Sequence, residues 1–197
     1  MSRILFYTIL IGAVTGAGFL LWPHIAKDMA ARDLHKTGTV QYALTGTNGK
    51  TITERTFGDQ FTLVVFGYTQ CPDVCPTSLQ DMSLALDELG DKSKQVIPVF
   101  ITIDPERDFG EDLQSYVTNF HSSFIGLSGT PEAIQAAAKA FRVYFKQEQP
   151  SPDAPDDYLV SHSASIYLIG PNGQGPLKTF KYGDTPEHMA ASIRKSL

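Results

Sequence analysis

Cysteine, tryptophan and clustered positive charge are scarce in this sequence. Its 197 residues include two cysteines and one tryptophan, the formal net charge is −5, and lysine and arginine form no cluster. Proteins that bind DNA or RNA contact the phosphates of the nucleic acid with a basic patch, so the lack of a lysine and arginine cluster excludes nucleic-acid binding as the function. No internal repeat is visible, and 42% of the residues are apolar, which suffices for one well-buried domain. With so few thiols available, the placement of the two cysteines is the most informative feature of the chain.

The longest uncharged apolar run lies near the start of the sequence. Residues 4–22, ILFYTILIGAVTGAGFLLW, are long enough to cross roughly 30 Å of hydrocarbon as a helix. Trp22 and Pro23 suit an interfacial anchor and a helix stop. A cleaved signal peptide is the alternative, but it usually has a shorter apolar core and a clearer cleavage site. We therefore expect an uncleaved transmembrane anchor at 1–23, followed by a polar tether at 24–39.

Residues 40–197 show the alternation of strands and helices that is typical of an α/β domain. Continuous apolar runs predict buried strands, and apolar residues at every third or fourth position predict helices. Asn48 and Gly49 suit a hairpin turn, whereas the proline- and aspartate-rich segment 147–158 predicts a solvated loop. The expected elements are a hairpin at 40–57, strands at 61–68, 95–103 and 124–129, helices at 77–90, 111–120, 130–141 and 185–197, and a second hairpin at 163–182.

This order of elements also predicts the fold. Strands that alternate with helices favour a mainly parallel sheet. The sequence of strand, helix, strand, helix, hairpin and helix matches the thioredoxin-like plan. We therefore predict an α/β, thioredoxin-like fold with an N-terminal β-hairpin and a central strand-helix insertion, preceded by the single transmembrane helix.

Both cysteines lie in one short segment, FGYTQCPDVCPTSL at 66–79, between a predicted strand and a predicted helix. The unpaired N–H groups and the positive dipole end of a helix N-terminus stabilise thiolate, so we expect the pKa of both Cys71 and Cys75 to lie below the usual value of about 8.5. A structural disulfide is the plainer alternative, but closing so small a ring contributes only about 2 kcal/mol. Thiol exchange and metal binding are therefore favoured, and a third ligand would distinguish them.

One of the five histidines is placed to be that ligand. The other four lie in the tether, on a predicted helix or at the end of one, where solvated or capping roles are expected. His162 instead follows the long loop and precedes a buried strand, which in a thioredoxin-like sheet lies beside the strand that leads to the cysteines. Two thiolates and one imidazole form a ligand set suited to Cu(I), or to Cu(II) with a further ligand.

Three segments of the chain resemble the signature blocks of the Sco/SenC family of copper metallochaperones. They are GYTQCPDVCPTSL at 67–79, ITIDPERD at 101–108 and VSHSASIYLIGPNG at 160–173, and the resemblance covers about residues 40–197. We expect Asp104 and Arg107, in the second segment, to fix a loop at the same rim of the sheet as the cysteines, with possible contacts to a partner protein.

The resemblance implies both a metal site and a biological role. Cys71, Cys75 and His162 match the copper ligands of the family. The family delivers copper to the CuA centre of cytochrome c oxidase subunit II, and a donor chaperone would supply the copper. The resemblance also implies a bacterial inner-membrane protein with its domain in the periplasm, or the mitochondrial equivalent that faces the intermembrane space. Ser161 stands where the family usually has aspartate, which we expect to affect Cu(II) affinity and kinetics.

Other functions are compatible with two cysteines on such a fold. A thiol-disulfide oxidoreductase that acts on the oxidase subunit is the main alternative, but the spacing is Cys-x-x-x-Cys and no proline occurs between Tyr158 and Gly170, where thioredoxins carry their cis-proline. A peroxidase is disfavoured because Thr69 precedes Cys71 by two residues, whereas peroxiredoxins place threonine three residues before the cysteine. A redox or copper sensor within the same family stays open. We expect a metallochaperone rather than an enzyme.

Overall fold

The computed structural model describes residues 38–149 and 158–197. The anchor expected at 1–23 and nearly all of the tether expected at 24–39 lie outside the described residues. Within the described part of the chain, no helix combines the length and the apolar character needed to cross a membrane.

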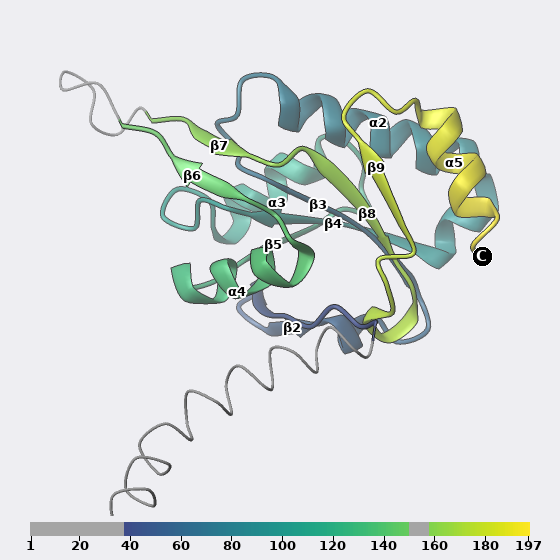
Figure 1. The fold of residues 1–197 in the computed structure, drawn as a ribbon, viewed down its shortest axis with the longest axis horizontal. Coiled ribbons are helices and arrows are strands. Elements are labelled where there is room, and N and C mark those ends of the chain that lie inside the picture. Colours follow the sequence, from purple (N-terminus) through teal and green to yellow (C-terminus); the bar gives the residue numbers. More distant parts are fainter. Residues whose placement is uncertain (1–37, 150–157) are drawn as a thin grey trace, which may run out of the picture. The chain divides into compact units, whose positions relative to one another are not determined.

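The middle of the domain is a mixed sheet of seven strands (Figure 1). Its three central strands run parallel to one another, and the strands added on either side are antiparallel to their neighbours. From one edge to the other the strands are β2 (Thr51–Thr53), β1 (Ala43–Gly46), β5 (Ile125–Ser128), β4 (Val96–Thr102), β3 (Phe61–Gly67), β8 (Ser165–Ile169) and β9 (Lys178–Lys181).

Helices cover both faces of this sheet (Figure 1). One face is covered by three of them, α2 (Val74–Leu89), α3 (Gly110–Thr118) and α5 (Pro186–Arg194). The other face is covered by α4 (Pro131–Phe141), which begins with a capping Thr130 hydroxyl that accepts the Ala133 N–H. Three short 3-10 helices complete the fold: η1 (Glu54–Phe57), η2 (Gly90–Gln95) and η3 (Pro171–Gly173).

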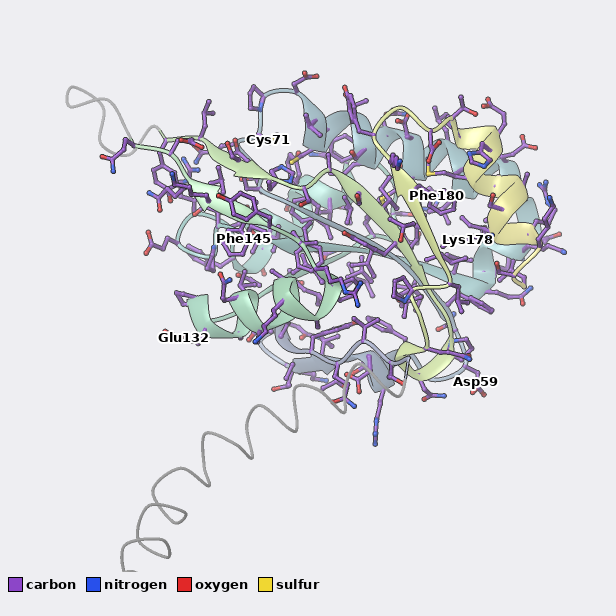
Figure 2. All side chains as sticks on the ribbon, in the orientation of Figure 1. Asp59, Cys71, Glu132, Phe145, Lys178 and Phe180 are labelled. Carbon is purple, nitrogen blue, oxygen red and sulfur yellow. The ribbon has the colours of Figure 1, made fainter. Side chains whose placement is uncertain are left out.

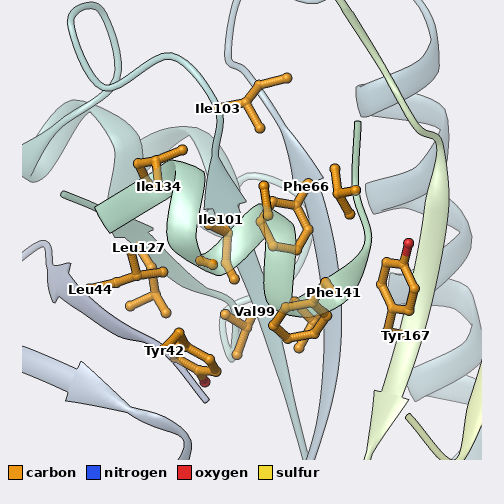
Figure 3. Packing of buried hydrophobic residues seen from close by; sticks show 14 of the residues in the cluster. Tyr42, Leu44, Phe66, Val99, Ile101, Ile103, Leu127, Ile134, Phe141 and Tyr167 are labelled. Atoms are coloured by element: carbon orange, nitrogen blue, oxygen red, sulfur yellow. The ribbon is translucent and has the colours of Figure 1, made fainter. Parts of the chain in front are cut away.

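Strand β3 contributes to two hydrophobic cores because successive side chains of a strand point to opposite faces. Val64 and Phe66 enter the core under α4, where the Phe66 ring packs edge-on against Phe141 at 5.1 Å (Figure 3). Leu63 and Val65 enter the core shared with α2, α3 and α5. Each fully buried side chain of this kind contributes about 1.5–3 kcal/mol, so burial holds both helical layers against the strand that leads to the cysteines.

The predicted α/β architecture is confirmed, including both hairpins. Strands β1 and β2 pair around the Asn48–Gly49 turn, where Gly49 adopts a φ of +77°. Strands β8 and β9 form the second hairpin, and β8 pairs with β3 as a thioredoxin-like sheet requires. Helix α2 begins at Val74 rather than at the predicted residue 77, which places Cys75 inside its first turn.

A separate two-stranded ribbon was not predicted. Strands β6 (Phe145–Gln147) and β7 (Val160–His162) pair antiparallel, with Phe145 opposite His162, and they are not hydrogen-bonded to the larger sheet. Gln147 was expected to open the solvated loop. Each strand has only three residues and shows no run of alternating apolar side chains, so the local pattern carries no strand signal.

Candidate metal centre

The two cysteines lie where β3 is joined to α2: Cys71, labelled in Figure 2, is in the connecting turn, and Cys75 is in the first turn of α2. The Cys71 N–H donates to the Tyr68 carbonyl at 3.2 Å, which closes the turn after the strand. The next turn begins the helix, and Cys75 lies in it with 2% of its surface exposed. Cys71 is partly exposed. The site therefore has one buried sulfur and one that solvent reaches.

Gly67, the last residue of β3, makes room for the buried sulfur. A Cβ atom at this position would lie 2.7 Å from Cys75 Sγ and 2.9 Å from a ring carbon of Phe100. Distances this short do not occur between such atoms in folded proteins, so only glycine lets the first turn of α2 pack this closely against the strand. The sequence analysis did not identify this role.

His162 reaches the cysteines from the ribbon. Its Nδ1 lies 3.0 Å from the Ser163 carbonyl oxygen, and because a carbonyl only accepts, Nδ1 carries the proton. The lone pair of Nε2 is therefore free to bind a metal, and Nε2 lies 3.4 Å from Cys75 Sγ. The Tyr68 ring packs edge-on against the imidazole at 6.0 Å. The structure brings Cys71, Cys75 and His162 together, with their ligand atoms within 4.8 Å of one another.

The two thiols differ in acidity. The pKa of Cys71 is lowered, mainly because its thiolate accepts a hydrogen bond from the Cys75 side chain and also because backbone N–H groups of Asp73 and Cys75 face it. The pKa of Cys75 is raised by the same hydrogen bond and by burial. The expectation of two acidified thiols is thus wrong for Cys75. The pair shares one proton, which must leave when both sulfurs bind a metal ion.

The donor set fits copper. Thiolates are soft ligands that favour Cu(I), and an imidazole nitrogen suits either oxidation state. Structural zinc sites use four protein ligands. Among residues 38–149 and 158–197, no carboxylate, further thiol or further imidazole joins the cluster of Cys71, Cys75 and His162.

Asp108 supports the turn that carries Cys71, and sequence reasoning missed it. Its carboxylate, 1% exposed, accepts the Thr69 N–H at 2.9 Å, the Thr69 hydroxyl and the Thr102 hydroxyl at 2.8 Å. Burial raises the pKa of Asp108, and the hydrogen bonds from the two threonines oppose that rise. The available signal was the second aspartate of ITIDPERD. Because the Thr69 hydroxyl donates to Asp108, it is not directed at Cys71 as a peroxidase would require.

Asp104 and Arg107 fix the neighbouring loop, as expected. Asp104, 4% exposed, pairs with the Arg107 guanidinium and accepts the Tyr158 hydroxyl at 2.8 Å. Ser161, by contrast, points away from the cluster, since successive residues of β7 face opposite sides and His162 faces the cysteines. The Ser161 hydroxyl donates at 2.7 Å to the carboxylate of Glu148, the residue that follows β6.

A thioredoxin-like domain in which a Cys-x-x-x-Cys turn and a distant histidine converge defines a narrow class of metal-binding proteins. The family model of SCO1/SenC matches residues 30–197. The chain therefore belongs to the SCO1/SenC family, and the predicted family is confirmed.

Similar proteins come from bacteria, plants, fungi and animals. The human mitochondrial SCO1 homologue is 39% identical over 155 residues, which cover 77% of this chain and 50% of the human protein. Protein sco1 of Schizosaccharomyces pombe is 34% identical over 195 residues, 94% of this chain and 74% of that protein. The chain thus spans about half the length of several relatives, including the human one and the SCO1 homolog 1 of Arabidopsis thaliana, at 51%.

Solved structures share the fold. Copper-bound ScoI of Bradyrhizobium japonicum is 38% identical, with a TM-score of 0.72 over 81% of this chain and 99% of the other. Copper-bound ScoI of Arabidopsis thaliana is 34% identical, with a TM-score of 0.71 over 80% of this chain and 99% of the other. These likenesses confirm the predicted thioredoxin-like fold.

Proposed function

We propose that this protein is a copper chaperone that binds one copper ion through Cys71, Cys75 and His162. The observation that carries the proposal is the convergence of three soft or borderline ligand atoms within 4.8 Å. They come from segments 87 positions apart in the sequence. Two similar proteins of the same family have structures with copper bound. Copper is the cargo here, so the site must release it as well as hold it.

A recipient takes the ion by ligand exchange. A thiolate of the recipient approaches from solvent, bonds to copper and displaces Cys71 or His162, which are both partly exposed. Copper keeps its oxidation state, and the released cysteine pair takes back the one proton that it lost on binding. A disulfide between Cys71 and Cys75 has no sulfur anions to offer, so the redox state of the pair controls loading.

The recipient we propose is the CuA centre of cytochrome c oxidase subunit II, during assembly of the oxidase, with a separate chaperone as the copper donor. The support is family membership. The apolar run at 4–22 supports an anchor at 1–23 in the bacterial inner membrane, a tether at 24–39 and the copper-binding domain, 40–197, in the periplasm. An alkaline phosphatase fusion after residue 39 tests the orientation, since the enzyme is active only on the periplasmic side.

Competition for Cu(I) tests the site. The reduced full chain, purified in detergent, is titrated against a chelator of known affinity, and the His162→Ala and Cys71→Ser variants are compared with it. Loss of a hydrogen bond that supports a ligand lowers metal affinity by about 10- to 100-fold. Because these substitutions remove a ligand itself, each variant should lose more Cu(I) affinity than that. The matched control is His121→Ala, whose imidazole contacts Ser123 and Asp87, neither of which belongs to the cluster. Unchanged affinity in His162→Ala would remove this residue from the site. Transfer is followed as the CuA electron paramagnetic resonance signal of an oxidase subunit II fragment.

A thiol-disulfide oxidoreductase is the second candidate, favoured by one observation. Cys71 is a partly exposed thiol with a lowered pKa, and Cys75 lies beside it as a resolving thiol. In such a reaction Cys71 attacks a partner disulfide, Cys75 then attacks the mixed disulfide, and the partner leaves as a dithiol while this chain is oxidised. Insulin reduction with an excess thiol reductant and a copper chelator distinguishes the two. Sustained turnover without copper would favour the enzyme.

A further inference from the structure

One guanidinium connects the two halves of the metal site. Arg107 lies in the loop between β4 and α3, with 13% of its side chain exposed. Its Nη1 donates to the Gln70 side-chain oxygen at 3.0 Å, and Gln70 is the neighbour of Cys71. Its Nη2 donates to the Tyr158 carbonyl at 3.1 Å, and Tyr158 stands two residues before β7, which ends at His162. Arg107 therefore ties the cysteine turn to the segment that carries the histidine.

The guanidinium is held in a fixed plane. Its Nε pairs with one carboxylate oxygen of Asp104, and the other oxygen accepts the Tyr158 hydroxyl at 2.8 Å. The guanidinium carbon lies 3.6 Å from the centre of the Tyr158 ring, a close cation–π contact. A planar group with five N–H donors can make these contacts at once, whereas a lysine ammonium cannot.

The ribbon depends on such side-chain contacts. Strands β6 and β7 pair only with each other, and an isolated two-stranded hairpin is at best marginally stable in water. Val160, the first residue of β7, is buried and anchors that end of the ribbon in the core. Arg107, which joins β7 to the cysteine turn, also lies 5.7 Å from the centre of the Tyr68 ring, the ring that packs on His162.

We propose that Arg107 is a positioning residue of the copper site, which holds the ribbon against the cysteine turn and so determines whether the His162 imidazole reaches the ion bound by the two sulfurs. Arg107 contributes no ligand and transfers no proton. The inference rests on the proposed copper binding and goes beyond it by assigning the histidine's placement to one side chain outside the ligand set.

The first test compares Arg107→Gln with the unchanged full chain after loading with Cu(II). Coupling of a nitrogen nucleus to copper, measured by electron paramagnetic resonance, should weaken or vanish in the variant, while the thiolate-to-copper absorption persists. Arg55→Gln is the matched control, because it also removes one positive charge but from a side chain 77% exposed beside Glu54. Nitrogen coupling that is unchanged in Arg107→Gln would overturn the inference.

A double-mutant cycle separates positioning from a general effect of charge or stability. Arg107→Gln should lower the Cu(I) affinity of the unchanged chain by about 10- to 100-fold, the usual effect of losing a supporting contact. In the His162→Ala background, Arg107→Gln should cause no further loss of Cu(I) affinity, because the imidazole that Arg107 positions is already absent. Equal losses in both backgrounds would overturn the inference.

The copper-free protein provides a third readout. The Ser163 N–H, which donates to the Tyr144 carbonyl at 2.9 Å, should exchange with deuterium faster in Arg107→Gln than in Arg55→Gln. If Arg107→Gln does not fold, Arg107→Lys replaces it in all three measurements, since lysine keeps the charge but lacks the fork. Failure of the unchanged chain to bind copper would defeat the proposed function itself, whereas normal binding with no response to either substitution would defeat only the role of Arg107.

Discussion

Replacing Gly67 with alanine tests the packing that places the buried sulfur. The added methyl would lie 2.7 Å from Cys75 Sγ and 2.9 and 3.2 Å from two ring carbons of Phe100. Favourable separations between such atoms are about 3.5–4.0 Å, so the sulfur and the ring must together give way by about 1 Å. Strand β3 is paired on both sides and Phe100 is fully buried, so Cys75 and the first turn of α2 are the parts that can shift.

Two measurable losses follow from that shift. Overpacking a core usually destabilises a protein by about 1–3 kcal/mol. Replacing glycine with alanine also reduces the entropy of the unfolded chain, which stabilises the folded state by about 0.4–1 kcal/mol. We therefore expect Gly67→Ala to lower the free energy of unfolding in urea by about 0–2.6 kcal/mol. Metal sites tolerate ligand displacements of only about 0.2 Å, so Cu(I) affinity should fall much more clearly than stability, by at least about 10-fold.

Gly126→Ala is the matched control. A Cβ at Gly126 would lie 2.8 Å from Leu113 Cγ, a clash of similar size, but in the core beneath α3 rather than beside a cysteine. This variant should lose stability to a similar extent and keep its Cu(I) affinity. If Gly67→Ala binds Cu(I) as tightly as the unchanged chain, or if both variants lose affinity equally, the argument that Gly67 positions Cys75 fails.

Three further predictions concern the groups around the ligands. Because burial raises the pKa of Asp108 above its unfolded value of about 3.9, the folded state holds that proton more tightly than the unfolded state does. The stability that this carboxyl contributes is therefore lost as pH rises from about 4 through the folded pKa. In urea titrations at a series of pH values, the free energy of unfolding of Asp108→Asn should not show this decline. In the reduced, copper-free chain, iodoacetamide should alkylate Cys71 before Cys75, since Cys71 is the more exposed and the more acidic; equal rates by mass spectrometry would contradict this. Ser161→Asp replaces the hydroxyl that donates to Glu148 with a like charge, so it should destabilise the ribbon by up to about 1 kcal/mol. Adding Glu148→Gln removes the repulsion and should restore the lost stability.

Much of this architecture follows from patterns that are local in the sequence. The apolar runs of β3 and β4 predict buried strands because hydrophobic burial determines where such segments go. The order of strands then predicts that β8 lies beside β3, and this order is what places His162 near Cys71 and Cys75. Topology favours the meeting of these three residues at one end of the sheet, and the resemblance of their segments to the signature blocks of the family identifies them as ligands.

The supporting residues could not be predicted in the same way. Gly67 is required because β3 and the first turn of α2 lie very close together, and the neighbouring residues in the sequence do not indicate that distance. Asp108 matters because it accepts hydrogen bonds from Thr69, 39 positions earlier in the chain. Strands β6 and β7 are three residues each and are stabilised by contacts with the rest of the fold rather than by their own pattern. Such features depend on tertiary contact, which a single sequence does not display.

The unequal burial of the two sulfurs suits the proposed chaperone function, in which the site both holds and releases its ion. Cys75 is enclosed by Gly67, the strand and its own helix, so no recipient thiolate can approach from its side. Cys71 and His162 are partly exposed and belong to a turn and to a small ribbon, both of which can yield without disturbing the sheet. In the transfer that we propose, a recipient exchanges these two ligands first, and the bond to Cys75 is the last to break. This proposed order of release follows from which element carries each ligand, and under it the ribbon that Arg107 contacts is the part of the site that controls transfer.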